Sequence, residues 1–535
     1  MRILGRILAL ILALGCSIAP AEVRAQTQRR AAAQQPVRAT GSLADRIRKI
    51  LAEPELSHLQ VGISVTSRNG DNVYSLNDAQ LFPPASTAKL ATTATAFGLL
   101  PVSTLTWTTF VTADGEVDSS GTLHGNLLLL GVGDPTLDGR RYPYPEPGTK
   151  AAEPAPKAMD VLDLIAEQVE QSGVRKIDGN VVGDDSYFLY EPFGKGWGWD
   201  DIQWSYGAAV SALSFNDNGI GLSFAGKGGA GATTAQWTPD VDYYTLDNSM
   251  TVAAQGAEAH PGVERQPGTL MVRAWGTAPA DGLQVSLAVE DPAQFTATAF
   301  AKAIEARGIH VTGSPVSAHR LVLGDGDFAA ERGQKVELHP SDLSTIVAPV
   351  QEKRVLAAHI SGPVAQAIAV ANKASVNLHA ELLLRLLGKI EGSDGSFEQG
   401  SRVVRQFLVD AGVNDADFFL YDGSGMSPDD RIAPRAYTKL LAWASHQSWG
   451  EAWRQTLPVA GVDGTLENRF RDTPLKGKMW AKTGTLNEVN AMAGYLTAAS
   501  GRNLAFAVML NGRRPGSDME ARAIDRIVEA IAAAN

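Results

Sequence analysis

Apolar residues follow two different spacings near the N-terminus of the chain. Leu43, Ile47 and Ile50 recur at the spacing of one helix face. Residues 61–65 then alternate apolar positions with small or polar ones, and the chain turns at Asn69-Gly70 and returns as a second strand-like run. Because this dipeptide suits a tight two-residue turn, the pattern predicts a helix followed by a β-hairpin.

The C-terminal end repeats this combination in the opposite order. Residues 479–512 contain three strand-like runs joined by short polar turns, and Ile524, Ile527 and Ile531 then lie on one face of a final helix. Since each end supplies strands and a helix, we expect one antiparallel sheet built from both termini. The fold class that this pattern favours is mixed, α+β/α/β, with helices flanking the sheet and a helical subdomain beside it.

A long region of different composition separates the two ends. It is rich in glycine and in strand-like runs, and 216–282 is its part richest in glycine and turn residues. We therefore expect two inserted, β-rich domains, one nested in the other. The predicted segments are a signal peptide at 1–25, a tether at 26–42, a catalytic domain at 43–105 and 346–535, an inserted domain at 106–215 and 283–345, and a nested domain at 216–282.

Two helices are predicted within and after the inserted region. Asp291-Pro292 is typical of a helix start and Gly308 of a helix end, which predicts a helix over 291–308. The run beginning at Ser375 predicts another helix, in which Glu381 and Arg385 stand four positions apart and form an expected ion pair.

Length and charge exclude some classes of partner. At 535 residues the chain exceeds one ordinary core. Its formal net charge of −11 argues against nucleic acid or anionic lipid as a partner. The scattered histidines show no spacing typical of metal ligands, so we expect no metal and no cofactor.

The first residues have the pattern of an export signal. Arg2 and Arg6 precede an apolar run that is too short to span a bilayer, and small residues follow, so that cleavage after Ala21 or Ala25 would fit. The only cysteine, Cys16, lies in this segment, and the sequence leaves its lipidation open. We expect an exported, periplasmic protein without a stable membrane span.

Candidate chemistry begins with a serine and a lysine three positions apart. Ser86 and Lys89 stand at the head of an apolar helical stretch, where residues at i and i+3 share one face. Burial favours the neutral form of a lysine, and a neutral amine can take the proton of a neighbouring hydroxyl. The alternative is structural, with Ser86 as a helix cap and Lys89 extending to water.

Two motifs downstream decide between these readings. Ser375-Val376-Asn377 begins a long apolar helix, and Lys482-Thr483-Gly484-Thr485 begins a strand of the terminal sheet, where its glycine permits a close backbone approach. Together with Ser86-x-x-Lys89, this order of motifs is the signature of active-site serine enzymes that recognise penicillin.

Longer stretches carry a more specific resemblance. The chain resembles the D-alanyl-D-alanine carboxypeptidase/endopeptidase family of low-molecular-mass (class C) penicillin-binding proteins over residues 43–535. The stretches that carry it are GVGDPTL (131–137), VVGDDSYF (181–188), GWGWDD (196–201), YGAAVSALSFNDN (206–218), NKASVNLHAELLLR (372–385), YDGSGMSPDDRIAP (421–434), GVDGTLENRF (461–470) and AKTGTLNEVNAMAGYL (481–496). This resemblance implies a transpeptidase/β-lactamase-like domain with two inserted domains. It also implies peptidoglycan stem peptides as substrates and β-lactams as covalent inhibitors.

The resemblance assigns a role to each motif residue. Ser86 would attack the D-Ala-D-Ala amide while Lys89 takes its proton. Ser375 and Lys482 would return a proton to the leaving nitrogen, and Asn377 would hold the substrate amide and orient Lys89. The backbone N–H groups of Ser86 and Thr485 would form the oxyanion hole. The strand motif would face the substrate, with Lys482 and Thr483 near its carboxylate and Gly484 beside them.

Other positions depart from the family or have two readings. His379 stands where tyrosine is common in the family. Asp184 matches a position near the free amine of the stem peptide's diamino acid, yet it also suits a turn carboxylate that bonds its own backbone. Trp197 and Trp199 suit either a core turn or a patch that faces glycan.

Two other functions share part of this pattern. A serine β-lactamase has the same three motifs but a far shorter chain, and a non-catalytic module that senses penicillin or binds peptidoglycan would be expected to have decayed motifs. The sequence leaves open the balance of carboxypeptidase and endopeptidase activity, the identity of the diamino acid, the β-lactam profile and the oligomeric state.

Overall fold

The computed structural model describes residues 42–148, 154–226, 231–322, 335–350, 353–392, 394–514 and 516–535. The expected signal peptide with Cys16, and all of the tether except its last residue, lie outside these ranges. Within the described part, no helix has the length and apolar character needed to cross a bilayer.

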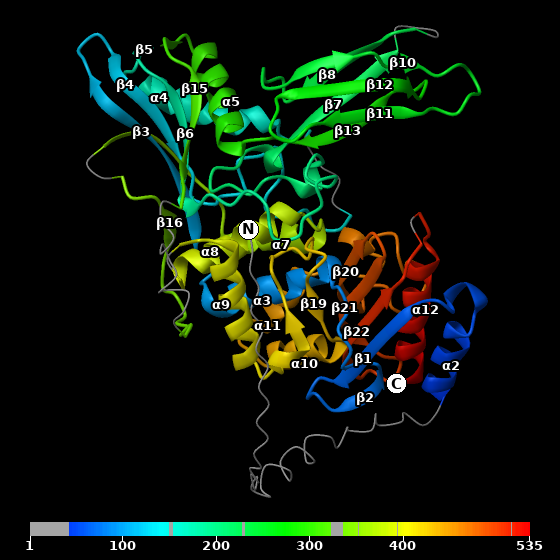
Figure 1. Ribbon diagram of the computed structural model, residues 1–535. Helices are drawn as coiled ribbons and strands as arrows, with labels where there is room; N and C mark the ends of the chain where they lie inside the picture. The colour runs from blue at the N-terminus through cyan, green and yellow to red at the C-terminus, as the bar shows by residue number, and fades with distance from the viewer. Residues whose placement is uncertain are drawn as a thin grey trace, which may run out of the picture. The chain divides into compact units, whose positions relative to one another are not determined.

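The two ends of the chain form one five-stranded antiparallel sheet, in the order β2-β1-β22-β21-β20 (Figure 1). Its strands are β1 (Gln60–Ser67), β2 (Asn72–Leu76), β20 (Met479–Leu486), β21 (Val489–Thr497) and β22 (Asn503–Asn511). The N-terminal hairpin pairs with the last strand through β1 and β22, which confirms a sheet built from both termini.

Helices cover both faces of this sheet. On one face, α2 (Ser42–Leu51) and α12 (Met519–Ala534) bury the predicted apolar positions, including Ile47, Ile524 and Ile527, against the strands (Figure 1). Because the other face is also covered, β1 is buried at nearly every position instead of at alternate ones. The helices on that second side are α3 (Lys89–Leu99), α7 (Val364–Lys373), α8 (Asn377–Ile390), α9 (Phe397–Asp410), α10 (Pro434–Ala444) and α11 (Gly450–Gln455).

Short elements join these helices. They are η1 (Pro54–Leu56), η2 (Ala85–Ala88), η5 (Asp415–Asp417), η6 (Gly464–Leu466) and the strand pair β18 (Phe418–Phe419) and β19 (Arg431–Ile432). The expected ion pair of Glu381 and Arg385 in α8 was wrong. Arg385 donates instead to backbone carbonyls, among them that of Glu191, and Glu381 accepts backbone N–H groups of the 423–424 loop. Both side chains are buried, so they meet the hydrogen-bonding needs of loops packed on the helix.

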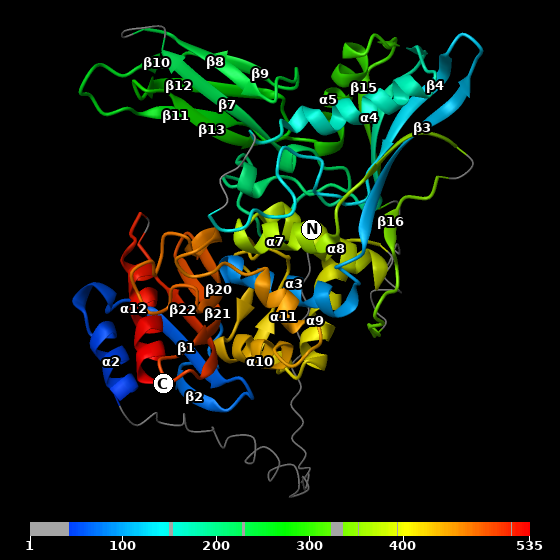
Figure 2. The same cartoon turned by 180° about the vertical axis from the view of Figure 1, so that it is seen from behind.

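The inserted region contains an eight-stranded mixed sheet. Its strands are β3 (Thr106–Val117), β4 (Thr122–Leu130), β5 (Lys176–Ile177), β6 (Val181–Leu189), β14 (His310–Val311), β15 (Pro315–Arg320), β16 (Thr345–Val347) and β17 (Arg354–Ile360). Helices α4 (Ala158–Gln171) and α5 (Pro292–Ala306) lie against it, as Figure 2 shows from behind. The predicted start of α5 is confirmed, because the Asp291 carboxylate accepts the N–H of Gln294 and Pro292 occupies the first turn.

The nested part consists of two smaller sheets. One contains β7 (Gly219–Gly226), β8 (Thr233–Thr238) and β13 (Leu283–Ala288), and the other β9 (Thr245–Asn248), β10 (Thr251–Val252), β11 (Pro261–Arg265) and β12 (Met271–Ala278). The 3-10 turns η3 (Ser205–Gly207) and η4 (Asn216–Asn218) precede them.

Strand pairing corrects two of the expected segment boundaries. β13 pairs with β7, so the nested domain extends to residue 288 rather than 282. β16 and β17 pair with β3, so the inserted domain continues to residue 360 rather than 345. In both cases the partner strand is far away in the sequence, and a local change of composition does not reveal such pairing.

Candidate active site

The predicted nucleophile and base stand together at the start of a buried helix. Ser86 lies in η2 and Lys89 begins α3. Lys89 Nζ lies 2.8 Å from the hydroxyl oxygen of Ser86, so the predicted i, i+3 contact is confirmed. The helix-cap alternative for Ser86 is not what the structure has, because Pro84 occupies the N-cap position of η2.

Burial makes Lys89 suitable as a base. Its side chain is fully buried, and Nζ also lies 2.7 Å from Asn377 Oδ1 and 3.1 Å from the carbonyl oxygen of Ser424. The loss of hydration lowers the pKa of Lys89 to about 7, although nearby acidic groups oppose this shift. A large share of neutral amine is therefore present near neutral pH, beside the hydroxyl of Ser86.

A second lysine and serine face each other across the same site. Lys482 Nζ donates to Ser375 Oγ at 2.8 Å and to the carbonyl of Thr483 at 2.8 Å. Burial, and then the charge of Lys89, hold the pKa of Lys482 well below its usual range. Ser375 has a φ of +60°, in the left-handed region where a non-glycine residue costs of the order of 1–3 kcal/mol. Such strain is found where the surrounding structure holds a side chain in place.

Gly484 permits a close backbone contact, as the sequence predicted. A Cβ atom at this position would lie 2.7 Å from the carbonyl oxygen of Pro84 and 3.1 Å from the backbone nitrogen of Ser86. The strand β20 therefore packs directly against the turn that carries Ser86, and only a glycine leaves room for this contact.

The rest of the strand motif lies along an edge of the sheet. β20 is the last strand in the sheet order, so one of its sides faces away from β21. Thr483 Oγ1 donates to Thr465 Oγ1 at 2.8 Å, and the Asn490 amide donates to Thr485 Oγ1 at 2.9 Å. An edge strand can pair with an extended peptide through its backbone, which is a common way of binding a peptide substrate.

Sequence reasoning missed the role of Glu381 in this site. Its carboxylate accepts the N–H groups of Gly423 and Ser424, both at 2.8 Å. It thereby fixes the loop whose Ser424 carbonyl faces Lys89. The available signal was an acidic residue in the middle of an apolar helix, a position that usually requires a buried partner.

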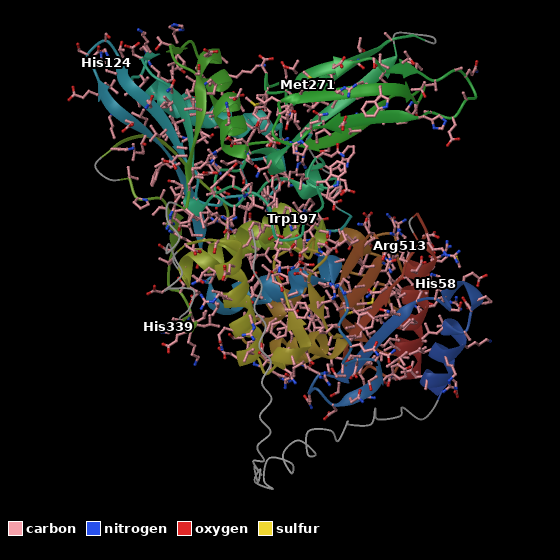
Figure 3. The ribbon with its side chains drawn as sticks, in the orientation of Figure 1. His58, His124, Trp197, Met271, His339 and Arg513 are labelled. Carbon is pink, nitrogen blue, oxygen red and sulfur yellow. The ribbon has the colours of Figure 1, made fainter. Side chains whose placement is uncertain are left out.

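Trp197 belongs to the structural support of the same loop. Its indole N–H donates to Asp422 at 2.9 Å, and its ring lies edge-on to Phe397. Trp197 is placed where the inserted segment meets the helices of the sheet domain (Figure 3). It is thus a core turn residue, whereas Trp199 is 75% exposed.

The inserted domain also contacts a predicted catalytic residue, Asn377. The side-chain amide of Asn377 donates to the carbonyl oxygen of Tyr206 at 2.8 Å, while its Oδ1 faces Lys89. Tyr206 was not identified from the sequence as a site residue. A backbone carbonyl carries no sequence signal, because any residue type supplies one.

Asp184 is not part of this cluster. Its carboxylate accepts the N–H of Ser186 at 2.9 Å, which is the local turn contact that the sequence left open as an alternative. It lines a cavity of about 480 Å³ with the cationic side chains of Arg320, Lys353 and Lys389. These cations would compete with a substrate amine for the Asp184 carboxylate, and the substrate role of Asp184 stays a prediction.

One group of described residues offers ligand atoms of the kind that bind metals. Asp138, Asp217 and His379 place one such atom each within 4.8 Å of the others. Arg140 donates to Asp217, however, and Tyr142 donates to Asp138 at 3.0 Å. Hydrogen bonds thus already engage these carboxylates.

Comparisons with known proteins agree on one family. A family model described as the D-Ala-D-Ala carboxypeptidase 3 (S13) family matches residues 43–325 and 325–534. The D-alanyl-D-alanine carboxypeptidase of Actinomadura sp. (strain R39) is 30% identical over 491 residues, which are 88% of this chain and 81% of that protein. The D-alanyl-D-alanine carboxypeptidase DacB of Haemophilus influenzae is 24% identical over 474 residues, 86% of this chain and 87% of that one.

A solved structure shares the fold. The crystal structure of penicillin binding protein 4 (dacB) from Haemophilus influenzae matches 92% of this chain and 98% of its own, with a TM-score of 0.73 and 22% identity. The mixed fold expected from the sequence is therefore confirmed.

Proposed function

The chain belongs to the D-Ala-D-Ala carboxypeptidase 3 (S13) family, and from this premise we propose how its own residues perform the reaction. The protein is a serine-type D-Ala-D-Ala carboxypeptidase that acts on peptidoglycan stem peptides through an acyl-enzyme. The observation that carries this proposal is the contact of Ser86 Oγ with the buried amine of Lys89, at 2.8 Å.

The first step forms the acyl-enzyme. Lys89, as the neutral amine, takes the proton of Ser86 while Oγ attacks the carbonyl carbon of the D-Ala-D-Ala amide. Backbone N–H groups of Ser86 and Thr485 stabilise the oxyanion that develops. When the tetrahedral intermediate collapses, the C–N bond breaks and the amine of the last D-alanine must gain a proton. Ser375, hydrogen-bonded to Lys482, is in a position to pass on the proton that Lys89 took, so that its own hydroxyl ends unchanged.

The second step releases the shortened peptide. Water attacks the ester carbonyl, and a base takes its proton and passes it to Ser86 Oγ, which leaves as the hydroxyl. A β-lactam enters the same first step, because its ring amide opens on Ser86 and gives an ester. The leaving nitrogen then stays tethered to the acyl group, which hinders the second step.

The neighbourhood of β20 supports peptide binding in an extended form. Residues 458–460 bond the start of its outer edge, so an extended peptide would pair with the strand beyond Ala481. Thr483 and Lys482 bring a hydroxyl and a cation to the same strand. A cross-linked peptide presents the same D-Ala carbonyl as a pentapeptide does, so the same site also serves for DD-endopeptidase action.

Product analysis tests this function. Purified protein is incubated with a monomeric pentapeptide muropeptide and with a cross-linked dimer, and the products are analysed by mass spectrometry. We expect loss of one D-alanine from the pentapeptide and cleavage of the dimer. Fast turnover of β-lactams without any change in the muropeptides would instead indicate a β-lactamase, and no turnover of either would indicate a binding module.

We also propose that the protein is exported to the periplasm, on the basis of its first 25 residues. Mass spectrometry of the mature N-terminus after cell fractionation tests this proposal. A periplasmic form beginning at Glu22 or Gln26 is expected, and a cytoplasmic form that keeps Met1 would contradict it.

A further inference from the structure

The inserted segment touches helix α8 at two places that lie two residues apart. The Tyr206 carbonyl accepts from the Asn377 amide at 2.8 Å, and Asp217 Oδ1 lies 3.1 Å from His379 Nε2. Asn377 belongs to the proposed catalytic set, whereas His379 stands where the family commonly has tyrosine. The second contact is therefore a feature of this chain that the family resemblance does not explain.

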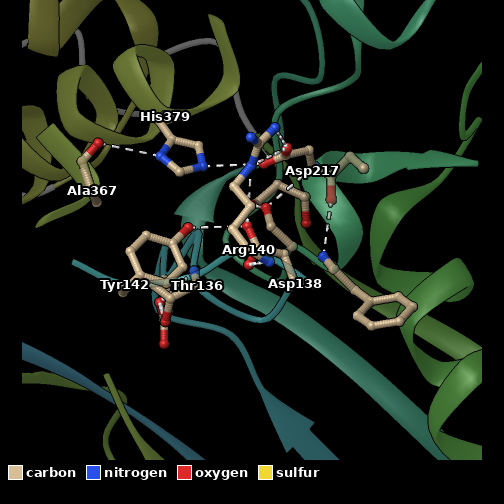
Figure 4. Close-up of polar contacts among 12 residues, drawn as sticks. Thr136, Asp138, Arg140, Tyr142, Asp217, Ala367 and His379 are labelled. Carbon is tan, nitrogen blue, oxygen red and sulfur yellow. Dashed lines mark hydrogen bonds and ion pairs between the residues drawn. The ribbon is translucent and has the colours of Figure 1, made fainter. Parts of the chain in front are cut away.

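His379 is enclosed between the inserted segment and helix α7. Its side chain is fully buried, and Nδ1 lies 3.3 Å from the carbonyl oxygen of Ala367 (Figure 4). The ring thus connects α7, α8 and the inserted segment. A contact of this kind transmits a displacement of one element to the other two, because a buried side chain cannot exchange its partner for water.

Asp217 holds a strained turn in place. Three consecutive residues, Asn216, Asp217 and Asn218, have φ values of 52°, 53° and 53°, a left-handed run that non-glycine residues rarely adopt. The Arg140 guanidinium donates to the second carboxylate oxygen of Asp217, with Nε at 2.9 Å (Figure 4). His379 and Arg140 contact the Asp217 carboxylate from two sides, and the side chains of Asn216 and Asn218 form hydrogen bonds within the turn.

The same turn is connected to Tyr206. The amide of Asn218 donates to the carbonyl of Ala209 at 2.8 Å and to Ser214 Oγ at 3.2 Å. Ala209 follows Tyr206 by three residues. From His379, a hydrogen bond therefore reaches Asp217, the backbone leads to Asn218, a second hydrogen bond reaches Ala209, and three residues of backbone lead to the Tyr206 carbonyl.

The Tyr206 carbonyl decides which end of the Asn377 amide faces Lys89. An amide that donates Nδ2 to Tyr206 must present Oδ1 to the Lys89 amine, as observed at 2.7 Å. If the carbonyl moved away, the amide could rotate and donate its NH₂ group to the lone pair of the neutral Lys89 amine, which is the lone pair that must take the proton of Ser86.

We propose that His379 is a positioning residue for acylation: through Asp217 it holds the Tyr206 carbonyl and with it the orientation of Asn377. This inference rests on the catalytic role proposed for Asn377. His379 itself touches neither the substrate nor the reacting atoms.

A double-mutant experiment tests this role. The rate of acylation by a labelled penicillin and the melting temperature are measured for His379→Leu, for Asn377→Ala and for the double variant. We expect His379→Leu to slow acylation about tenfold, which is the range of coupling through packed networks. In the Asn377→Ala background the same change should have no further effect, because the two residues act on one step. His379→Gln, which keeps a donor toward Asp217, should recover most of the rate.

Two controls separate a positioning role from a structural one. Thr438→Val, in helix α10, removes a buried hydrogen bond to Ser64 of strand β1 and should lower the melting temperature without slowing acylation. If His379→Leu does not fold, Asp217→Asn serves in its place and should show the same dependence on Asn377.

If the His379 or Asp217 substitution slowed acylation equally in the wild type and in Asn377→Ala, the inference would be overturned. A lower melting temperature with an unchanged acylation rate would also overturn it. If Asn377→Ala alone acylated at the wild-type rate, the catalytic role of Asn377 would be wrong. An effect of His379 on acylation through Asn377 would then be excluded.

Discussion

At the scale of single residues, the chemistry depends on a lysine placed in a fully buried position. Lys89 has three oxygen partners, and burial lowers its pKa to about 7. Glu381 titrates in the same region, since burial and the charge of Asp422 raise its pKa to about 8. A proton on Lys89 would prevent the role as a base that we propose for this amine.

We expect acylation by penicillin to rise with pH through about 7 and then to level off. As pH rises through the lowered pKa, Lys89 changes from the ammonium, which cannot accept a proton, to the neutral amine. The midpoint belongs to the coupled group of Lys89 and Glu381 rather than to one residue. Stopped-flow acylation rates between pH 5 and 9 measure this profile.

Lys89→Arg is the matched control for that profile. Arginine keeps the positive charge but stays protonated at every accessible pH. Acylation should fall by about three orders of magnitude and lose its rise near pH 7. A variant that acylates close to the wild-type rate would contradict a base role for Lys89.

The sequence allowed these residues to be found because each lies in a short motif with fixed spacing. Ser86 and Lys89 are local neighbours on a helix turn, so three positions of sequence determine their contact. The local bond of Asp184 to Ser186 does not decide its role, because the cations around it come from elements remote in sequence. The contact of Tyr206 with Asn377 could not be predicted, because the backbone carbonyl of Tyr206 makes it and its side chain takes no part.

At the scale of elements, two glycines let loops and strands close on the nucleophile. Gly484 brings β20 against the Ser86 turn. Gly425, in the 421–434 loop, has a φ of +80°, and a Cβ there would lie 1.8 Å from the carbonyl oxygen of Ala85. The active site therefore depends on backbone contacts between three elements.

The Gly425→Ala variant should unfold more easily than the wild type, and its acylation should be slower. The left-handed φ alone costs about 1–2 kcal/mol for a non-glycine residue, and the clash with Ala85 adds to this cost. Gly501→Ala is the matched control, because Gly501 has a φ of +86° and nothing within 4 Å of the added Cβ. Urea unfolding and penicillin labelling of both variants compare the two effects. Equal loss of stability in both, with normal labelling, would contradict the contact at Gly425.

Local sequence patterns predicted where helices and strands form better than they predicted which strands pair. The N-terminal hairpin, the C-terminal strands and the start of α5 follow from turn chemistry and caps, which act within a few residues. The pairing of β13 with β7, and of β17 with β3, joins strands that are distant in sequence. Those pairings depend on the folded arrangement, and for this reason the expected boundaries at 282 and 345 were too early.

At the scale of the whole molecule, the inserted region contains a half-buried ionic contact of its own. His319 lies between Asp185, at 2.8 Å, and Asp291, at 3.3 Å, and stacks on Tyr190. Burial opposes its charge, yet the hydrogen bonds to the two carboxylates raise the pKa of His319 to about 10. The contact connects β6, β15 and the start of α5.

We expect this contact to make stability fall at alkaline pH. A raised pKa means that the folded chain holds the proton more tightly than the unfolded chain, whose histidine has its ordinary pKa of 6.5. The stabilisation is therefore complete below about pH 6.5 and is lost as pH rises toward 10. The free energy of unfolding of the His319→Gln variant should be about 2 kcal/mol lower than that of the wild type at pH 6, and this difference should be smaller at pH 10. Urea unfolding at both pH values measures it, and a constant difference would rule out the ionic account.

The central claim is that Ser86 forms the acyl-enzyme, and peptide mapping after labelling with a penicillin tests it most directly. Wild-type protein is incubated with the drug, digested and analysed by mass spectrometry beside Ser86→Ala. We predict one adduct in the wild type, on the peptide that contains Ser86, and none in the variant, whose melting temperature should stay close to that of the wild type. An adduct on another residue, or labelling that survives in a folded Ser86→Ala protein, would contradict the account.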